Sequence, residues 1–174
     1  MQAEDTNRAS MNPERKFLGD RMLGTLTRYL RFLGYDCESA DTLASGNPGE
    51  DTMLLAWAEK EGRILLTRDR ELAGRAREHG MYIREKDILD QVKMLREHGL
   101  IDLKVRLIRC SLCNTLLRGA TDEEIRGADY APSVPGDFIY LWCPTCRRLY
   151  WNGTHSESII RRIDDLSQRS ENAP

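Results

Sequence analysis

Four of the five cysteines occur in two closely spaced pairs. Cys110 and Cys113 form the first CxxC pair, Cys143 and Cys146 form the second, and 29 residues separate the two pairs. Two such pairs supply the four thiolates that a tetrahedral zinc ion needs, and sites of this type are structural. Disulfide pairing is the alternative in an exported protein, but the sequence shows no apolar leader. The sequence therefore predicts a structural zinc ribbon in the last third of the chain.

A second set of chemically capable residues is acidic and lies near the ends of predicted strands. Asp20 and Asp69 directly follow short apolar runs, and Glu50 and Asp51 open a predicted helix. In an open parallel sheet such positions converge at the carboxyl edge, where ligands bind. Clustered carboxylates repel one another unless a cation neutralises them, and Mg²⁺ or Mn²⁺ prefers oxygen ligands. A metal held in this way activates water for hydrolysis of a phosphodiester.

Helix capping is the competing explanation for the same acids. Asp20, Asp51 and Asp69 each precede or open a predicted helix, and aspartate is favoured there because it accepts hydrogen bonds from free backbone N–H groups. Capping alone would explain the pattern without a metal ion. From spacing alone, both interpretations remain open.

The elements that must position these residues alternate between strand and helix. This alternation predicts right-handed crossovers and an α/β domain with a parallel sheet flanked by helices. Short apolar runs predict the strands, and leucines at helical spacing that end at glycine predict the helices. The expected strands are residues 16–19, 35–40, 63–67 and 81–84, the expected helices are 23–33, 50–61, 70–79 and 87–98, and residues 138–142 and 148–151 are expected to form a hairpin.

Length and composition limit the organisation of the chain to two modules. The 174 residues carry a net charge of -2, so no global basic field attracts a polyanion and any such partner must be held locally. No apolar run approaches the roughly 20 residues of a membrane helix, and we expect a cytoplasmic protein. We predict a disordered tail at 1–15, the α/β domain at 16–100, the zinc ribbon with a C-terminal helix at 101–166, and a frayed tail at 167–174.

Several basic and aromatic side chains are suited to RNA. Guanidinium groups match phosphate oxygens, and aromatic rings stack on unpaired bases. The arginines could instead be ordinary solvent-exposed side chains, which is the interpretation we favour for Arg28 and Arg31 on the first helix. The aromatic residues could instead form the core of the ribbon. The leftover Cys37 is interpreted as a small buried hydrophobe, with a reactive thiol as the alternative. The RNA-binding candidates are Arg21, Arg68, Arg70, Arg147, Arg148 and Trp151.

Longer motifs resemble one known family. FLGDRMLG at 17–24, TRYLRFLGYD at 27–36 and EGRILLTRDR at 61–70 resemble the Mut7-C RNase domain family. CSLCN at 110–114, CPTC at 143–146 and YWNGTH at 150–155 resemble the zinc ribbon that ends the same family. The resemblance covers roughly residues 16–160.

The resemblance implies a PIN-like fold and a metal-dependent ribonuclease that gathers acids around Mg²⁺ or Mn²⁺. Asp20 and Asp69 match the family's acids in the first strand and in the Leu-Thr-Arg-Asp motif. The middle acid resembles Asp51, with Glu50 as a substitute, and Asp87 is a further candidate that also reads as a helix cap. One departure is Arg147, which stands where the family commonly has glycine and puts the geometry of that turn in question.

Together these features predict a ribonuclease with a structural zinc ion, a catalytic Mg²⁺ or Mn²⁺ ion, and a ribbon that aids RNA binding. One alternative is a non-catalytic module that binds RNA or protein, in which the acids only cap helices. The other is a toxin-like PIN ribonuclease that a protein partner keeps inactive. RNA is the expected partner in the main hypothesis, a protein partner or a homo-oligomer is compatible with it, and no membrane association is expected.

Overall fold

The computed structural model describes residues 15–44, 47–133, 136–152, 161–163 and 165. Apart from Arg15, the two predicted tails lie outside these residues, and so does most of the predicted C-terminal helix. None of the helices in the described part of the chain is long and apolar enough to cross a membrane.

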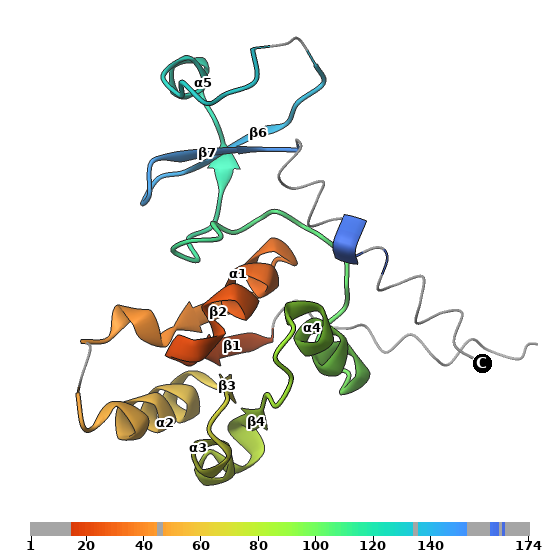
Figure 1. Ribbon diagram of the computed structural model, residues 1–174. Helices are drawn as coiled ribbons and strands as arrows, with labels where there is room; N and C mark the ends of the chain where they lie inside the picture. The colour runs from red at the N-terminus through yellow and green to blue at the C-terminus, as the bar shows by residue number, and fades with distance from the viewer. Residues whose placement is uncertain (1–14, 45–46, 134–135, 153–160, 164, 166–174) are drawn as a thin grey trace, which may run out of the picture.

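A parallel sheet of four strands organises the first hundred residues (Figure 1), as predicted. Its spatial order is β2-β1-β3-β4, so that β1 and β3 are central neighbours although β2 separates them along the chain. The winding direction therefore reverses between β1 and β3, and such a switch point is where α/β sheets bind ligands. The strands are β1 (Lys16–Gly19), β2 (Asp36–Ser39), β3 (Arg63–Thr67) and β4 (Gly80–Tyr82).

Helices cover both faces of this sheet because side chains alternate along each strand. Phe17 and Leu66 point to one face, where they pack with residues of α1 and α4. Leu18 and Leu65 point to the other face, where they pack with residues of α2 and α3. The two apolar clusters thus lie on opposite faces of the sheet, and the helices that carry them cover it from both sides (Figure 1). The helices are α1 (Gly24–Phe32), α2 (Glu50–Glu61), α3 (Arg70–Arg75) and α4 (Ile88–Glu97).

The helix expected over residues 70–79 is divided in two. After α3, the chain forms the short 3₁₀ turn η3 (Arg77–His79), and Arg77 adopts a left-handed φ of 52° that breaks the α-helix. The break lets the chain turn sharply into β4. At Gly80 a side chain would place its Cβ 2.1 Å from the Ala73 carbonyl oxygen, so only glycine allows this close approach.

The zinc-ribbon region forms an antiparallel sheet in the order β5-β6-β7. Strands β6 (Tyr140–Cys143) and β7 (Arg148–Trp151) form the expected hairpin, although β6 begins two residues later than expected. Strand β5 (Arg118–Gly119) and the short helix α5 (Asp122–Arg126) are not among the elements predicted from the sequence. Thr121 and Glu124 form a capping box that starts α5.

The segment between the two modules packs on the α/β domain. Ile101 is fully buried in the cluster that contains α1 and α4, and the Tyr35 hydroxyl accepts a 2.7 Å hydrogen bond from the Asp102 backbone N–H. Arg106 then donates to the Leu33 carbonyl oxygen at 2.9 Å. Ile163, far along the chain, is buried in the same cluster. Residues beyond position 100 thus complete the core of the first module.

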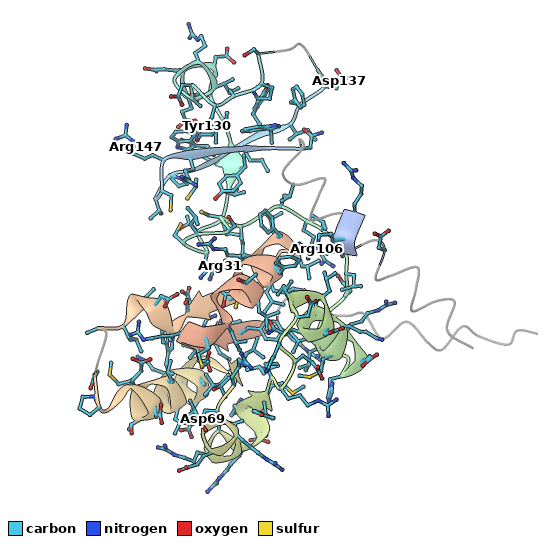
Figure 2. The ribbon with its side chains drawn as sticks, viewed as in Figure 1. Arg31, Asp69, Arg106, Tyr130, Asp137 and Arg147 are labelled. Atoms are coloured by element: carbon cyan, nitrogen blue, oxygen red, sulfur yellow. The ribbon has the colours of Figure 1, made fainter. Side chains whose placement is uncertain are left out.

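Strand β2 is an edge strand, and two side chains bind its outer backbone groups. Arg31 of α1 is only 4% exposed; its Nε donates to the Cys37 carbonyl oxygen at 2.8 Å, and its Nη1 donates to the carbonyl oxygens of Ser111 and Leu112. The Asn114 side-chain oxygen accepts from the Cys37 N–H at 3.2 Å. Figure 2 places Arg31 between the two modules. We call Arg31 and Asn114 the edge clamp. Our expectation that Arg31 is a solvated side chain is wrong.

Charged groups strengthen the contact between Asn114 and β2. The Asn114 amide nitrogen donates to Asp36 and to Glu38, at 2.8 Å in both cases. Asp36 also accepts from Arg63 at 2.7 Å. Burial by itself raises the pKa of Asp36, but the hydrogen bonds from Arg63 and Asn114 outweigh it and lower that pKa. Burial raises the pKa of the Cys37 thiol to about 12, which fits its interpretation as a buried hydrophobe.

We expect Arg31→Leu to destabilise the protein by about 2–4 kcal/mol, because three carbonyl oxygens lose their buried charged donor. Arg28→Leu is the matched control on the same helix, since Arg28 is exposed. That variant should change the free energy of unfolding by no more than about 0.5 kcal/mol. Urea unfolding measures both, and equal midpoints for the two variants would contradict the edge clamp.

Candidate functional site

The four cysteines of the two CxxC pairs form a compact group. Their sulfur atoms all lie within 4.8 Å of one another, and the Cys113 and Cys143 sulfurs are 3.5 Å apart. Zinc–sulfur bonds of about 2.3 Å in a tetrahedron require sulfurs at such separations. Among the His, Cys, Asp and Glu side chains of the described residues, these four cysteines form the group whose ligand atoms lie close enough together to bind one metal ion. The residues predicted to bind zinc are therefore brought together, and the group could hold one ion.

The two CxxC turns have the same backbone geometry. The Asn114 N–H donates to the Cys110 carbonyl oxygen at 3.0 Å, and the Arg147 N–H donates to the Cys143 carbonyl oxygen at 2.8 Å. Both residues are left-handed, with φ of 66° for Asn114 and 53° for Arg147. Asparagine tolerates this conformation better than arginine does. The turn at Arg147 therefore closes as a glycine would close it, at a conformational cost.

Neighbouring hydroxyl groups are placed to hold the cysteine sulfurs. The Tyr150 hydroxyl lies 3.1 Å from the Cys110 sulfur, and the Thr115 hydroxyl lies 3.3 Å from the Cys113 sulfur. Burial raises the pKa of Cys113, but hydrogen bonds, led by that of Thr115, lower it to about 6. The pKa of Cys146 is raised, first by its hydrogen bond with Cys113. Four adjacent sulfurs therefore resist joint ionisation until a cation neutralises them.

Asp20 lies at the carboxyl end of β1 and joins the two central strands. It is 9% exposed, and its Oδ1 accepts from the Met22 N–H at 2.9 Å, which caps the 3₁₀ turn η1 (Arg21–Leu23). Its Oδ2 accepts from the Arg68 N–H at 2.9 Å, just beyond the end of β3. The Asp20 N–H donates to the Leu66 carbonyl oxygen. The carboxylate is therefore fixed at the switch point of the sheet.

Asp69 lies one residue after Arg68 and caps α3. Its Oδ1 accepts from the N–H groups of Glu71 and Leu72 at 2.7 and 3.0 Å, and its own N–H donates to the Thr67 hydroxyl. Its Oδ2 has no hydrogen-bond partner in the described part of the chain, and the residue is exposed. One oxygen of Asp69 thus supports the fold while the other faces solvent.

The remaining candidate acids have other partners. Both carboxylate oxygens of Glu50 accept hydrogen bonds from Arg21 Nε, at 2.9 and 3.0 Å. Arg21 also donates to the Leu43 carbonyl oxygen, so its guanidinium links the start of α2 to the preceding loop. Asp51 is exposed in the first turn of α2, 3.5 Å from Arg75, and is not the cap, which is Gly49. Asp87 caps α4 through a 2.8 Å hydrogen bond from the Leu89 N–H.

The acids do not form a finished ligand cluster. Within the described residues, the ligand atoms of Asp20, Asp51 and Asp69 are not grouped as those of the cysteines are. Asp20 and Asp69 nevertheless follow neighbouring parallel strands and are linked through the backbone of Arg68. The capping interpretation holds for Asp20 and Asp69 but not for Asp51.

The predicted RNA-binding residues fall into two separate groups. Arg68 and Arg70 flank Asp69 at the carboxyl edge, whereas Figure 2 shows Arg147 at the opposite end of the molecule from Asp69. Arg148 is exposed at the start of β7. Trp151 is half-buried, and its ring lies 6.1 Å from that of Tyr130, so it contributes to the ribbon core.

Sequence reasoning missed three residues that shape these sites. Arg31 and Asn114 gave no signal beyond their residue types, because their partners are about 80 positions away in the chain. Tyr130, whose hydroxyl accepts from the Leu149 N–H at 2.8 Å, lies in a segment of low periodicity.

The geometry defines an α/β domain with acids at its switch point, joined to a four-cysteine ribbon. The chain belongs to the Mut7-C RNAse domain family, whose model matches residues 15–163. This membership indicates a nuclease-type function with RNA as the substrate class. Neither the curated proteins nor the solved structures contain a significant match to the chain.

We expect the purified protein to contain one zinc ion per chain, and Cys143→Ser to lose it. Because Asn114 directly follows a zinc-binding turn, loss of zinc should also release the Cys37 N–H and speed its hydrogen exchange. Metal analysis and hydrogen-exchange mass spectrometry measure these effects. Cys37→Ala is the control and should retain the zinc; unchanged zinc content in Cys143→Ser would contradict the assignment.

Replacing either of two neighbouring arginines by glycine should change the stability of the protein in opposite directions. Arg147→Gly removes left-handed strain and should stabilise the zinc-bound protein by about 0.5–1 kcal/mol. Arg148→Gly weakens β7 and should destabilise it by a similar amount, about 0.5–1 kcal/mol. Denaturant unfolding with zinc present compares them, and destabilisation by both changes would refute the strain at Arg147.

Proposed function

We propose that the protein is a metal-dependent ribonuclease whose catalytic site lies at the carboxyl edge of the parallel sheet. The observation that carries this proposal is the placement of Asp20 and Asp69 at the ends of neighbouring central strands, in a member of the Mut7-C RNAse domain family. Asp51, in the first turn of α2, is the third acid of the proposed site.

The bonds of these acids are compatible with a divalent cation. Asp69 keeps one oxygen free of hydrogen bonds within the described residues, and the capping bonds to its other oxygen fix the direction of the carboxylate. Asp20 is held by two backbone N–H groups. Mg²⁺ keeps several of its waters, so the acids can hold it through water as well as directly. When bound, Mg²⁺ or Mn²⁺ would lower the pKa of a water and offset charge on the leaving oxygen.

In this proposal, two separate groups of arginines contact the RNA, one at the carboxyl edge of the sheet and one on the ribbon. Arg68 and Arg70, beside Asp69, are placed to contact phosphates near the cleaved bond. Arg147 and Arg148 in the ribbon are far from Asp69 (Figure 2), so they would contact the strand several nucleotides away. In this proposal the zinc ribbon increases affinity for RNA and takes no part in the chemistry.

A non-catalytic RNA-binding module is the second candidate. The specific observation in its favour is that Asp20 and Asp69 both cap helical turns. A catalytic role and a capping role make different demands on the carboxylate, because asparagine caps a helix nearly as well as aspartate but is a poor ligand for Mg²⁺.

The sharpest test is therefore Asp69→Asn. We expect it to keep the stability of α3 within about 0.5 kcal/mol, because the retained side-chain oxygen still caps the helix. RNA cleavage in Mg²⁺ or Mn²⁺ should fall at least roughly a hundredfold, because the free carboxylate oxygen is lost. Cleavage of labelled single-stranded RNA and thermal unfolding are measured on the same samples.

Two further variants complete this experiment. Asp20→Asn should also abolish cleavage, but it should lower stability by about 1–2 kcal/mol because its amide group can accept only one of the two backbone hydrogen bonds. Asp90→Asn, an exposed acid in the first turn of α4, is the matched control and should cleave normally. Full activity in Asp69→Asn, or no cleavage by the wild type, would favour the binding module.

A further inference from the structure

A groove of about 460 Å³ lies beside the proposed catalytic edge. One wall is the face of α1 that carries Gly24, Arg28 and Arg31, which follow one another at the spacing of helical turns. The other wall is the end of β2 and the following 3₁₀ turn η2 (Ala40–Thr42). The first zinc-binding turn closes one end. Its volume is within the usual range for a site that takes a small ligand.

The groove contains one available cation. Arg31 is buried, and its guanidinium already donates to the carbonyl oxygens of Cys37, Ser111 and Leu112. Arg28, one turn earlier on α1, is exposed and forms no ion pair within the described residues. An exposed guanidinium without an ion-pair partner in the described residues is available to bind a phosphate group through two parallel hydrogen bonds.

The facing wall carries two carboxylates, of which Glu38 accepts a 2.8 Å hydrogen bond from Asn114 and Asp41 is the more available acceptor. The Asp41 side chain is 60% exposed; its Oδ2 accepts from the Ser39 hydroxyl at 3.1 Å, and its Oδ1 lies 3.8 Å from Arg21. These contacts leave acceptor positions on the carboxylate open to the groove. Carboxylates at such positions accept hydrogen bonds from ribose hydroxyls. Leu112, 40% exposed at the closed end, provides an apolar surface.

Gly24 keeps the groove open between these walls. Its backbone is right-handed helical, with φ of -56° and ψ of -36°, so any residue could adopt it. A Cβ at this position would have Asp41 Oδ2 as its nearest neighbour, at 3.9 Å. A larger side chain at Gly24 would therefore extend into the groove without straining the backbone.

We propose that this groove binds one unpaired ribonucleotide of the RNA substrate, with Arg28 contacting a phosphate and Asp41 accepting a hydrogen bond from the ribose 2′-hydroxyl. The proposal rests on the function proposed above, because η1 runs directly from Asp20 to the first residue of the groove wall. Arg21 of η1 contacts both Asp41 and Glu50, which joins the groove to the catalytic edge. The 2′-hydroxyl is the group by which proteins distinguish RNA from DNA. The groove thus accounts for substrate choice.

The test measures binding of fluorescent single-stranded RNA and DNA of the same sequence by anisotropy, without added divalent cation. The wild type should bind RNA more tightly than DNA. Asp41→Asn should reduce this preference about tenfold, because its neutral amide is a weaker acceptor for the 2′-hydroxyl. Arg28→Gln should weaken binding of both strands about tenfold, and Arg28→Lys should restore most of it.

A pair of glycine variants tests the groove by its shape. Gly24→Leu should weaken RNA binding about tenfold by filling the groove. Gly74→Leu is the matched control, because Gly74 also lies in a helix but outside the groove, and a Cβ added there has nothing within 4 Å. Thermal unfolding should show both variants folded, and equal RNA affinity for the two would overturn the proposal.

The outcomes separate this proposal from the ribonuclease itself. RNA preference that depends on Asp41 and RNA affinity that depends on Gly24, without cleavage in Mg²⁺ or Mn²⁺, support the groove and overturn the catalytic proposal. Cleavage that depends on Asp69, with the wild type binding RNA and DNA equally, overturns the groove and leaves the catalytic proposal standing.

Discussion

The hydrogen bonds that Arg31 and Asn114 make to Cys37 are the constraint on which the rest of the structure depends. An edge strand with unpaired N–H and C=O groups invites pairing with other chains, and here both outer groups of Cys37 are satisfied by side chains. One of these side chains comes from α1 and the other directly follows the CxxC turn of Cys110 and Cys113. The α/β domain and the ribbon are therefore joined through the backbone of β2, and the wall of the groove beside α1 is set by the same contact.

At the carboxyl edge, the proposed catalytic acids also support the fold. Asp20 and Asp69 cap helical turns, and the N–H groups that they bind hold their carboxylates in fixed directions. A preorganised carboxylate loses little freedom when it binds a cation, which is an advantage in a catalytic site. Capping and metal binding are therefore compatible uses of the same residues, and the exposed oxygen of Asp69 is the atom that separates them.

Local patterns in the sequence were sufficient for most of the fold and for the zinc site. The bounds of β1, β3 and α2 follow from short apolar runs and from Gly62, whose left-handed φ of 61° ends α2. The four cysteines were found because their spacing is itself the signal. Contacts between distant segments could not be predicted in this way. Nothing in the sequence of α1 distinguishes Arg31 from a solvent-exposed arginine. Its burial is explained by the packing of residues 111–114 against it.

The dependence of β2 on a CxxC turn that could hold zinc has a practical consequence for assays of RNA cleavage. A strong chelator, added to quench the proposed metal-dependent reaction, would also compete for zinc held by the four cysteines, and so would act on the fold through Asn114 and Cys37. Loss of signal after such a quench would then combine two effects with different reversibility. Adding back magnesium would restore only the ion proposed for the acidic edge, whereas recovery of a zinc-loaded ribbon would also require zinc and reduced cysteines.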